Sequence, residues 1–259
     1  MKNFDMDILL SSNNKRDFRT NKNMDAQKPN EFGVVEYLSI KDGGYPKPFD
    51  HNRCTPVSPM RQGWLEYKLS SKELQHVWDK VKNKDKEYHS NNLAGNNISS
   101  YTLENNDNWF FLNTLCPLLD IYGNTYGNMG KDMPMHNKYT YHLQSWWVNY
   151  QKQHDFNPTH HHKGLYSFVI WLKIPIEFSD QNKENVTNTP RNSSFCFEMT
   201  NMLGQIQHYA YQLGKLDEGT MLFFPSDLQH TVYPFYNCNE DRITVSGNIL
   251  LDDRSAEQK

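Results

Sequence analysis

From Tyr139 onward the sequence is a series of short runs of aromatic and β-branched residues separated by turn residues. Seven such runs follow one another: YTYHLQSWWVNYQ, LYSFVIWLKIP, SSFCFEM, IQHYAYQL, TMLFFP, HTVYPF and RITVSGNILL. Runs of this length and composition are typical of strands, and no helical pattern alternates with them as a parallel sheet would require. The pattern therefore predicts an antiparallel sandwich or small barrel, in a fold that is mainly β with flanking α-helices.

The chain has 259 residues, of which 37% are hydrophobic, so it is long enough for one sizeable core. Its first thirty residues are rich in Asn, Lys and Asp and hold too few large apolar side chains to fold alone. We expect a flexible arm at 1–30, a helical and loop support region at 31–138, the β core at 139–252 and a short tail at 253–259.

Two helices are expected in the support region. Ser70 followed by Glu73 fits a capping box at the start of a helix over about 71–86. Apolar residues then recur at helical spacing, at Leu74, Val77, Trp78 and Val81. A second helix is expected over about 107–122, where Pro117 should kink or end it because proline lacks a backbone donor.

Charge and cysteine content exclude several classes of protein. The 27 basic and 30 acidic residues give a net charge of −3, so nothing favours nucleic-acid binding. No apolar run approaches the roughly 18 residues that a membrane span needs, and we expect a soluble, unexported, cytoplasmic protein. The four cysteines are scattered and form no CxxC pair, so reduced thiols are expected and not disulfides or a thiolate zinc site.

Three consecutive histidines, His160 to His162, stand just ahead of the apolar run LYSFVIWLKIP. In an extended chain alternate side chains share a face, so His160 and His162 point together and His161 points away. His230 lies several strands later, at the junction of TMLFFP and HTVYPF, and an antiparallel meander can bring it back alongside them. These three histidines are therefore a candidate metal clamp.

Arg242 opens the run RITVSGN, in which Arg242, Thr244 and Ser246 alternate onto one face. A guanidinium on an inward face requires an anion, and its rigid fork matches a carboxylate. A dicarboxylate lying between the metal and Arg242 would satisfy all of these groups. Arg242 has an alternative, which is to pair with the neighbouring Glu240 or Asp241.

Taken together, NPTHHHKGLYSFVIWLKIP, EGTMLFFPSDLQHTVYPF and DRITVSGN resemble the double-stranded β-helix core of the iron(II)- and 2-oxoglutarate-dependent oxygenases. The resemblance is closest to members encoded by large tailed phages of marine cyanobacteria. It covers roughly residues 139–250, and residues 91–106 also resemble the upstream region of that group. Gly219, Phe224 and Pro225 match the turn and strand that precede the distal histidine.

The resemblance implies a role for each motif residue. His160 and His230 correspond to the first and distal histidine ligands, and Arg242 with Thr244 corresponds to the element that grips the distal carboxylate of 2-oxoglutarate. This chain departs from the family at His162, which stands where the superfamily usually has an aspartate. A third imidazole can still complete a facial triad, as in histidine-only sites of cupin-type dioxygenases. In an alternative register, His162 is the first ligand and Gly164 takes the carboxylate position, which leaves a coordination site open for a halide.

Aromatic residues near the motif leave two roles open. Tyr150 can aim its hydroxyl at the cosubstrate from a strand of the same barrel, or it can pack in the core. Trp146, Trp147 and Trp171 are expected to pack in the core, and one of them can wall the substrate pocket.

The implied activity uses Fe(II), 2-oxoglutarate and O2, hydroxylates a substrate and releases succinate and CO2, with no catalytic residue beyond the metal ligands. A three-histidine cupin-like dioxygenase that does not use 2-oxoglutarate is one alternative. A non-catalytic phage jelly-roll module, structural or carbohydrate-binding, is another. The substrate stays open among protein, nucleotide, lipid and small metabolite, as does the oligomeric state. A phage origin implies action in the cytoplasm of an infected bacterium.

Overall fold

The computed structural model describes residues 62–84, 95, 99–130, 140–183 and 189–252. The expected arm at 1–30 and tail at 253–259 lie outside these residues. Within the described part of the chain, no helix is long and apolar enough to span a membrane. Cys116, Cys196 and Cys238 are free thiols, as expected, and Cys54 lies outside the described residues.

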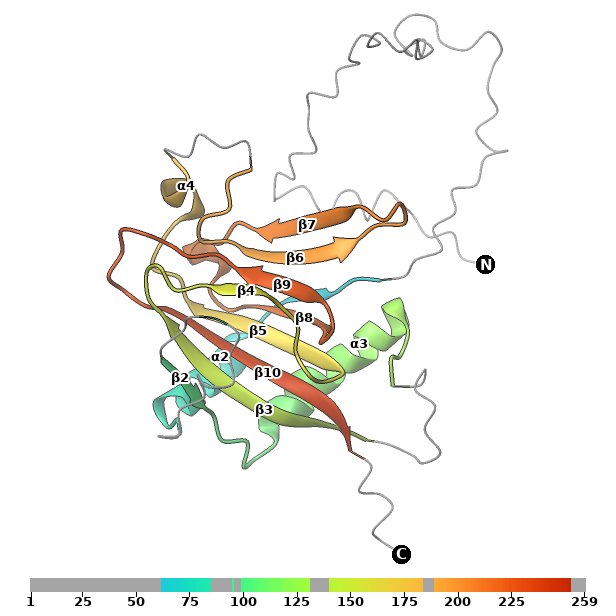
Figure 1. The fold of residues 1–259 in the computed structure, drawn as a ribbon. Helices are drawn as coiled ribbons and strands as arrows, with labels where there is room; N and C mark the ends of the chain where they lie inside the picture. The colour runs from blue at the N-terminus through green and yellow to red at the C-terminus, as the bar shows by residue number, and fades with distance from the viewer. Residues whose placement is uncertain (1–61, 85–94, 96–98, 131–139, 184–188, 253–259) are drawn as a thin grey trace, which may run out of the picture. The chain divides into compact units, whose positions relative to one another are not determined.

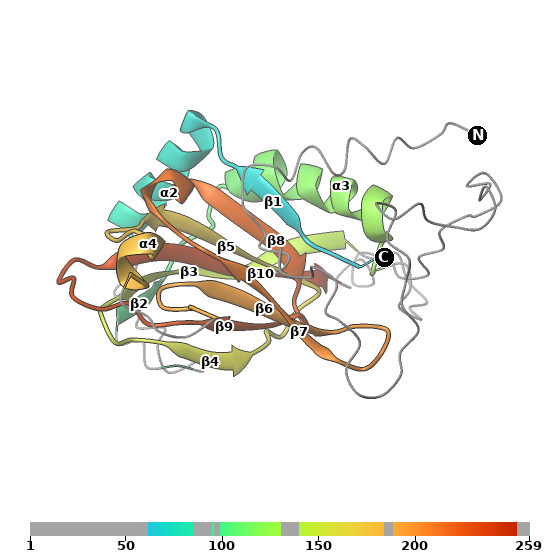
Figure 2. The ribbon, with the colours of Figure 1, turned by 90° about the horizontal axis from the view of Figure 1, so that it is seen from above.

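In the described part of the chain, ten strands form two sheets, and every strand pair is antiparallel. The larger sheet has the order β1 (Leu65–Lys68), β8 (Thr220–Pro225), β5 (Tyr166–Lys173), β10 (Arg242–Asp252), β3 (Thr140–Gln151) and β2 (Ser99–Thr102). The smaller sheet has the order β4 (Asn157–His160), β9 (Gln229–Val232), β6 (Phe195–Thr200) and β7 (Ile206–Tyr211). Figures 1 and 2 show the smaller sheet stacked on one face of the larger one. The predicted fold class, mainly β in a double-stranded β-helix arrangement, is confirmed.

β5 lies between two apolar cores, which explains why its sequence is almost continuously hydrophobic. Phe168, Ile170 and Leu172 face the core under the helices. Val169 and Trp171 face the core between the two sheets, where Phe195 and Phe197 of β6 also lie. Since successive side chains of a strand point to opposite faces, one short run can supply both cores.

The predicted first helix is α2 (Ser71–Lys82), and its capping box is present. The backbone N–H of Ser70 donates to Glu73 Oε2 at 2.8 Å, and the Ser70 hydroxyl accepts from the backbone N–H of Glu73 at 3.4 Å. Tyr67 and Thr114 also donate to the Glu73 carboxylate. These hydrogen bonds lower the pKa of Glu73 although its burial opposes them, so the cap also ties α2 to two neighbouring elements.

The second helical segment continues through Pro117. A turn of π-helix, η4 (Phe111–Leu115), leads directly into α3 (Cys116–Tyr126). Pro117 lies in the first turn of α3, where a missing N–H is tolerated because the wider π turn precedes it. The helix ends instead at Gly127, whose φ of 103° few other residues adopt readily. Of the two expected effects of Pro117, ending the helix is therefore wrong, and the helix runs to Tyr126, past the expected end near 122.

Candidate metal and anion site

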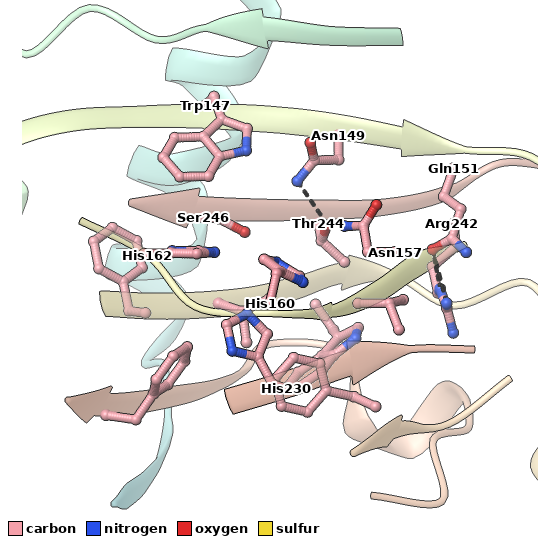
Figure 3. A pocket seen from close by; sticks show the side chains of 16 residues that line it. Trp147, Asn149, Gln151, Asn157, His160, His162, His230, Arg242, Thr244 and Ser246 are labelled. Carbon is pink, nitrogen blue, oxygen red and sulfur yellow. Dashed lines mark hydrogen bonds between the residues drawn. The ribbon is translucent and has the colours of Figure 1, made fainter. Parts of the chain in front are cut away.

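The three predicted histidines meet beside the smaller sheet. His160 ends β4 and pairs with His230 of β9 in the antiparallel register. His162 follows two residues later, where its backbone N–H donates to the carbonyl oxygen of Ser226 at 2.9 Å. Because alternate residues of an extended chain share a face, His160 and His162 point together, and strand pairing brings His230 to them (Figure 3).

One ring nitrogen from each of these histidines lies within 4.8 Å of the corresponding nitrogen of the other two. The ring centroids are 4.3 Å apart for His160 and His230, 4.9 Å for His162 and His230, and 5.3 Å for His160 and His162. Among the described residues, these three histidines are the one group of three or more potential metal ligands that lie close enough together to hold an ion.

Each imidazole has an oxygen acceptor at Nδ1. The acceptors are the backbone carbonyls of Pro158 for His160 (2.7 Å) and of Leu228 for His230 (2.9 Å), and the side-chain oxygen Oδ1 of Asn248 for His162 (3.0 Å). An acceptor at Nδ1 requires the proton on that nitrogen, which leaves the lone pair of Nε2 free for a metal. The hydrogen bonds thus prepare all three rings as ligands.

Burial keeps these imidazoles neutral. Desolvation lowers the pKa of His160, lowers that of His162 to about 4, and lowers that of His230 well below its ordinary value. The neighbouring imidazoles lower the pKa of His162 and His230 further, because two positive rings repel each other. Neutral imidazole is the form that binds a metal ion.

Arg242, the first residue of β10, is 1% exposed. Its Nε and Nη2 both donate to Gln151 Oε1, at 3.0 and 2.7 Å. Nη1 donates to the carbonyl of Ser193 at 2.6 Å and Nη2 to that of Tyr233 at 3.2 Å. All of these acceptors are neutral, and the burial lowers the pKa of Arg242 to about 10.

No carboxylate in the described part of the chain forms an ion pair with Arg242. The alternative partner Glu240 is bound instead to Lys173, at 2.7 Å. A buried cation without a counter-ion is costly, and one guanidinium N–H remains beyond the four hydrogen bonds. The surroundings of Arg242 therefore favour an anion at this position.

One cavity joins the histidine cluster to Arg242. It lies between the two sheets, and its polar lining includes His160, His162, His230, Asn149, Gln151, Arg242, Thr244 and Ser246. Trp147, Trp171, Phe195 and Phe224 form apolar parts of the wall. Figure 3 shows Thr244 of β10 between the histidines and Arg242. The predicted alternation of Arg242, Thr244 and Ser246 onto one face thus places all three in the cavity.

Tyr150 does not line this cavity. Its ring packs edge-on against Tyr101, 6.0 Å away, and the ammonium of Lys84 lies 5.2 Å from it. The cavity instead takes the neighbours of Tyr150 on β3, Asn149 and Gln151. The expectation that Tyr150 contacts the cosubstrate is therefore corrected, because the odd-numbered side chains at this end of β3 line the cavity and Tyr150 lies on the other face.

Gly164 is not part of the lining either. Its φ is +152°, and a Cβ built there would lie 2.9 Å from Ser226 Oγ, so close packing explains the glycine. The register in which His162 and Gly164 were the first two ligand positions would leave His160 aside. His160 instead lies with His162 and His230 in one group, which favours the register with His160 first.

Comparisons with known proteins give one family match and several similar solved structures. Residues 145–248 match the family model described as "Putative 2OG-Fe(II) oxygenase". None of the curated proteins matches the chain. A 2OG-Fe(II) oxygenase-family oxidoreductase from Burkholderia pseudomallei is similar in structure, with 12% identity over 70% of this chain and 78% of that one and a TM-score of 0.45.

Two further solved structures are similar. One is a prolyl-4-hydroxylase from Pseudomonas putida, with 11% identity, coverage of 72% of this chain and 91% of that one, and a TM-score of 0.41. The other is a prolyl hydroxylase from Trichoplax adhaerens in complex with a hypoxia inducible factor peptide fragment, with 13% identity, 76% and 88% coverage, and a TM-score of 0.46. The residues matched by the family model, 145–248, include the histidine cluster and Arg242.

Proposed function

We propose that this protein is an Fe(II)- and 2-oxoglutarate-dependent dioxygenase that hydroxylates its substrate. His160, His162 and His230 would hold the iron, and Arg242 with Thr244 would bind the distal carboxylate of 2-oxoglutarate. The observation that carries the proposal is the buried Arg242, which has no carboxylate partner among the described residues and shares one cavity with three neutral imidazoles.

The donor set fits iron. Imidazole nitrogens are good ligands for divalent iron, and each of the three rings has its Nε2 free. A triad with a carboxylate leaves a net charge of about +1 on the centre, whereas three neutral imidazoles leave the full charge of the ion. A dianionic cosubstrate would therefore be attracted more strongly here. When bound, iron and 2-oxoglutarate would supply the chemistry that uses O2 as the oxidant: one oxygen atom goes to succinate as CO2 is released, and the other goes to the hydroxyl group of the substrate.

The polar wall between the histidines and Arg242 is arranged to donate a hydrogen bond to a bound carboxylate. The Ser100 hydroxyl donates to Asn149 Oδ1 at 2.7 Å, which fixes the direction of the Asn149 amide. Asn149 Nδ2 then donates to Thr244 Oγ1 at 3.3 Å. Since Thr244 Oγ1 is the acceptor in that hydrogen bond, its own proton is available to a carboxylate beside Arg242.

The apolar walls would keep water from the reacting centre. Trp171, Phe195 and Phe224 are all less than 4% exposed and line the cavity next to His230. The ring of Phe195 lies 5.4 Å from that of His230, and Phe224 lies 5.2 Å from it. Apolar walls of this kind would strengthen the electrostatic attraction of the anionic cosubstrate to the iron and to Arg242.

A second candidate function is a three-histidine dioxygenase that does not use 2-oxoglutarate. The all-imidazole ligand set favours it. The guanidinium of Arg242, which has no carboxylate partner in the described part of the chain, favours the 2-oxoglutarate enzyme, because only a reaction with an acidic cosubstrate gives it a counter-ion in this cavity.

Calorimetry under anaerobic conditions separates the candidates. We expect one Fe(II) to bind per chain and 2-oxoglutarate to bind more tightly to the iron-loaded protein than to the metal-free protein, since chelation adds to the contact with Arg242. Iron binding with no measurable 2-oxoglutarate binding would favour the second candidate. Absence of iron binding would favour a non-catalytic module.

A further inference from the structure

His162 differs from the other two histidines in what fixes its ring. His160 and His230 are each held at Nδ1 by the carbonyl oxygen of the residue two positions earlier in the chain. His162 is held by the side chain of Asn248, which comes from the distant strand β10. A substitution at 248 therefore acts on one ring of the three and leaves the acceptors of the other two in place.

Asn248 is itself held in place by buried hydroxyls. Its Oδ1 accepts from Ser167 Oγ at 2.9 Å, and Ser167 Oγ lies 2.8 Å from Ser226 Oγ. Both serines are 0% exposed. The carbonyl of Ser226 accepts the backbone N–H of His162 at 2.9 Å, so the backbone and the ring of His162 are tied to one network.

The direction of the Asn248 amide decides which nitrogen of His162 can bind a metal. With Oδ1 toward the ring, Nδ1 carries the proton and Nε2 presents a lone pair to the cluster. With the amide nitrogen toward the ring, Nδ1 would be the acceptor and Nε2 would carry the proton, which is unsuitable for a ligand. The Ser167 hydroxyl, by donating to the same oxygen, favours the first arrangement.

We propose that Asn248 is a positioning residue that fixes the Nδ1–H tautomer of His162 and so makes this imidazole the third metal ligand, in the place where the superfamily usually has a carboxylate. The inference rests on the proposed function for the identity of the metal site, but the tautomer itself is a property of the metal-free protein. Ser167 and Ser226 act through Asn248 and do not touch the metal.

The first test is long-range 1H–15N correlation spectroscopy of the histidine-labelled, metal-free full chain at about pH 8, above the titration range of imidazole. The His162 signals are assigned by their loss in His162→Gln. In the wild type we expect the Nδ1–H pattern. Asn248→Leu should shift His162 toward the Nε2–H tautomer or an average of the two, and Asn248→Asp, which keeps the oxygen, should restore Nδ1–H.

One control variant and one further test variant complete the experiment. Asn239→Ala removes an exposed amide outside the cavity and should leave the His162 signals unchanged. Ser167→Ala removes one of the two hydrogen bonds to Asn248 Oδ1 and should give an intermediate shift, which keeps the test valid if Asn248→Leu folds poorly. An Nε2–H pattern in the wild type, or an unchanged pattern in both Asn248→Leu and Ser167→Ala, would overturn the proposal.

The second test measures the dissociation constant of Co(II) by its visible spectrum. Asn248→Leu should weaken Co(II) binding about 10- to 100-fold, the usual effect of removing a hydrogen-bond partner from a ligating histidine, and Asn248→Asp should restore it. Equal affinity in wild type and Asn248→Leu would contradict the positioning role. A wild type that binds no Co(II) yet shows the expected tautomers would contradict the proposed function and leave the role of Asn248 supported.

Discussion

His160 of β4 lies directly opposite His230 of β9 in the antiparallel register, with their ring centroids 4.3 Å apart. The pairing of these two short strands is what joins the first and last parts of the histidine cluster. His230 is also 3% exposed and held by Phe195 and Phe224. The most buried histidine of the cluster is thus the one farthest away in the sequence.

Loss of His230 should weaken iron binding strongly. We expect His230→Gln, which keeps much of the side-chain volume, to reduce Fe(II) affinity at least about 100-fold, because only two imidazoles remain. His208→Gln, at an exposed position of β7, is the matched control and should bind iron like the wild type. Metal content after anaerobic reconstitution measures both. Iron retained in His230→Gln at the wild-type level would refute the ligand assignment.

The buried histidines should make the metal-free protein less stable in mild acid. The pKa of His162 is about 4 when folded against 6.5 for an unperturbed histidine, so the unfolded chain binds more protons between these two pH values. The free energy of unfolding should therefore be fully present above about pH 6.5 and fall toward pH 4, by roughly 3 kcal/mol for this group.

Urea unfolding of the metal-free protein at a series of pH values measures this slope. His162→Gln should flatten it between about pH 4 and 6.5, because glutamine does not titrate. Exposed His161, whose ring is close to Asp227, provides the matched variant His161→Gln. If His162→Gln and the wild type showed the same slope, the ring would not be held in a desolvated, neutral state.

Gln151→Glu should compete with the cosubstrate for Arg242. Gln151 Oε1 already accepts hydrogen bonds from Arg242 Nε and Nη2. A glutamate carboxylate of nearly the same shape would therefore form an internal ion pair with the guanidinium. We expect 2-oxoglutarate affinity to fall at least about tenfold, or ~1.4 kcal/mol, while iron affinity is retained. Gln153→Glu, two residues along, is the control and should bind 2-oxoglutarate like the wild type. Equal affinity in both variants would mean that the anion binds elsewhere.

Much of the fold could be predicted because seven strands are recognisable from their aromatic and β-branched composition. Those runs are the strands β3 and β5 to β10. The strands that sequence reasoning missed have four residues each, and their apolar content is low. β4 even contains Pro158, which is tolerated because β4 is an edge strand whose place is fixed by pairing with β9.

The histidines and Arg242 could be proposed from their order and spacing, but the rest of the site depends on registers that the sequence does not reveal. Trp146 and Trp147 are both buried, one on each face of β3. The sequence of this run therefore does not indicate whether its odd- or even-numbered residues face the cavity. The run therefore offers Tyr150 as a candidate for the cosubstrate, whereas Asn149 and Gln151 line the cavity. Asn248 meets His162 only through the packing of β10 beside β5, which leaves no local signal.

The most direct test of the central claim is the visible absorption of the anaerobic, Fe(II)-loaded protein during titration with 2-oxoglutarate. A keto acid chelated to the iron gives a metal-to-ligand charge-transfer band. We predict that this band appears in the wild type and in Arg191→Ala, an arginine that packs on Tyr233. In Arg242→Ala at the same cosubstrate concentration it should be lost or require far more 2-oxoglutarate. Iron binding without the band in the wild type, or an unchanged titration in Arg242→Ala, would contradict the account.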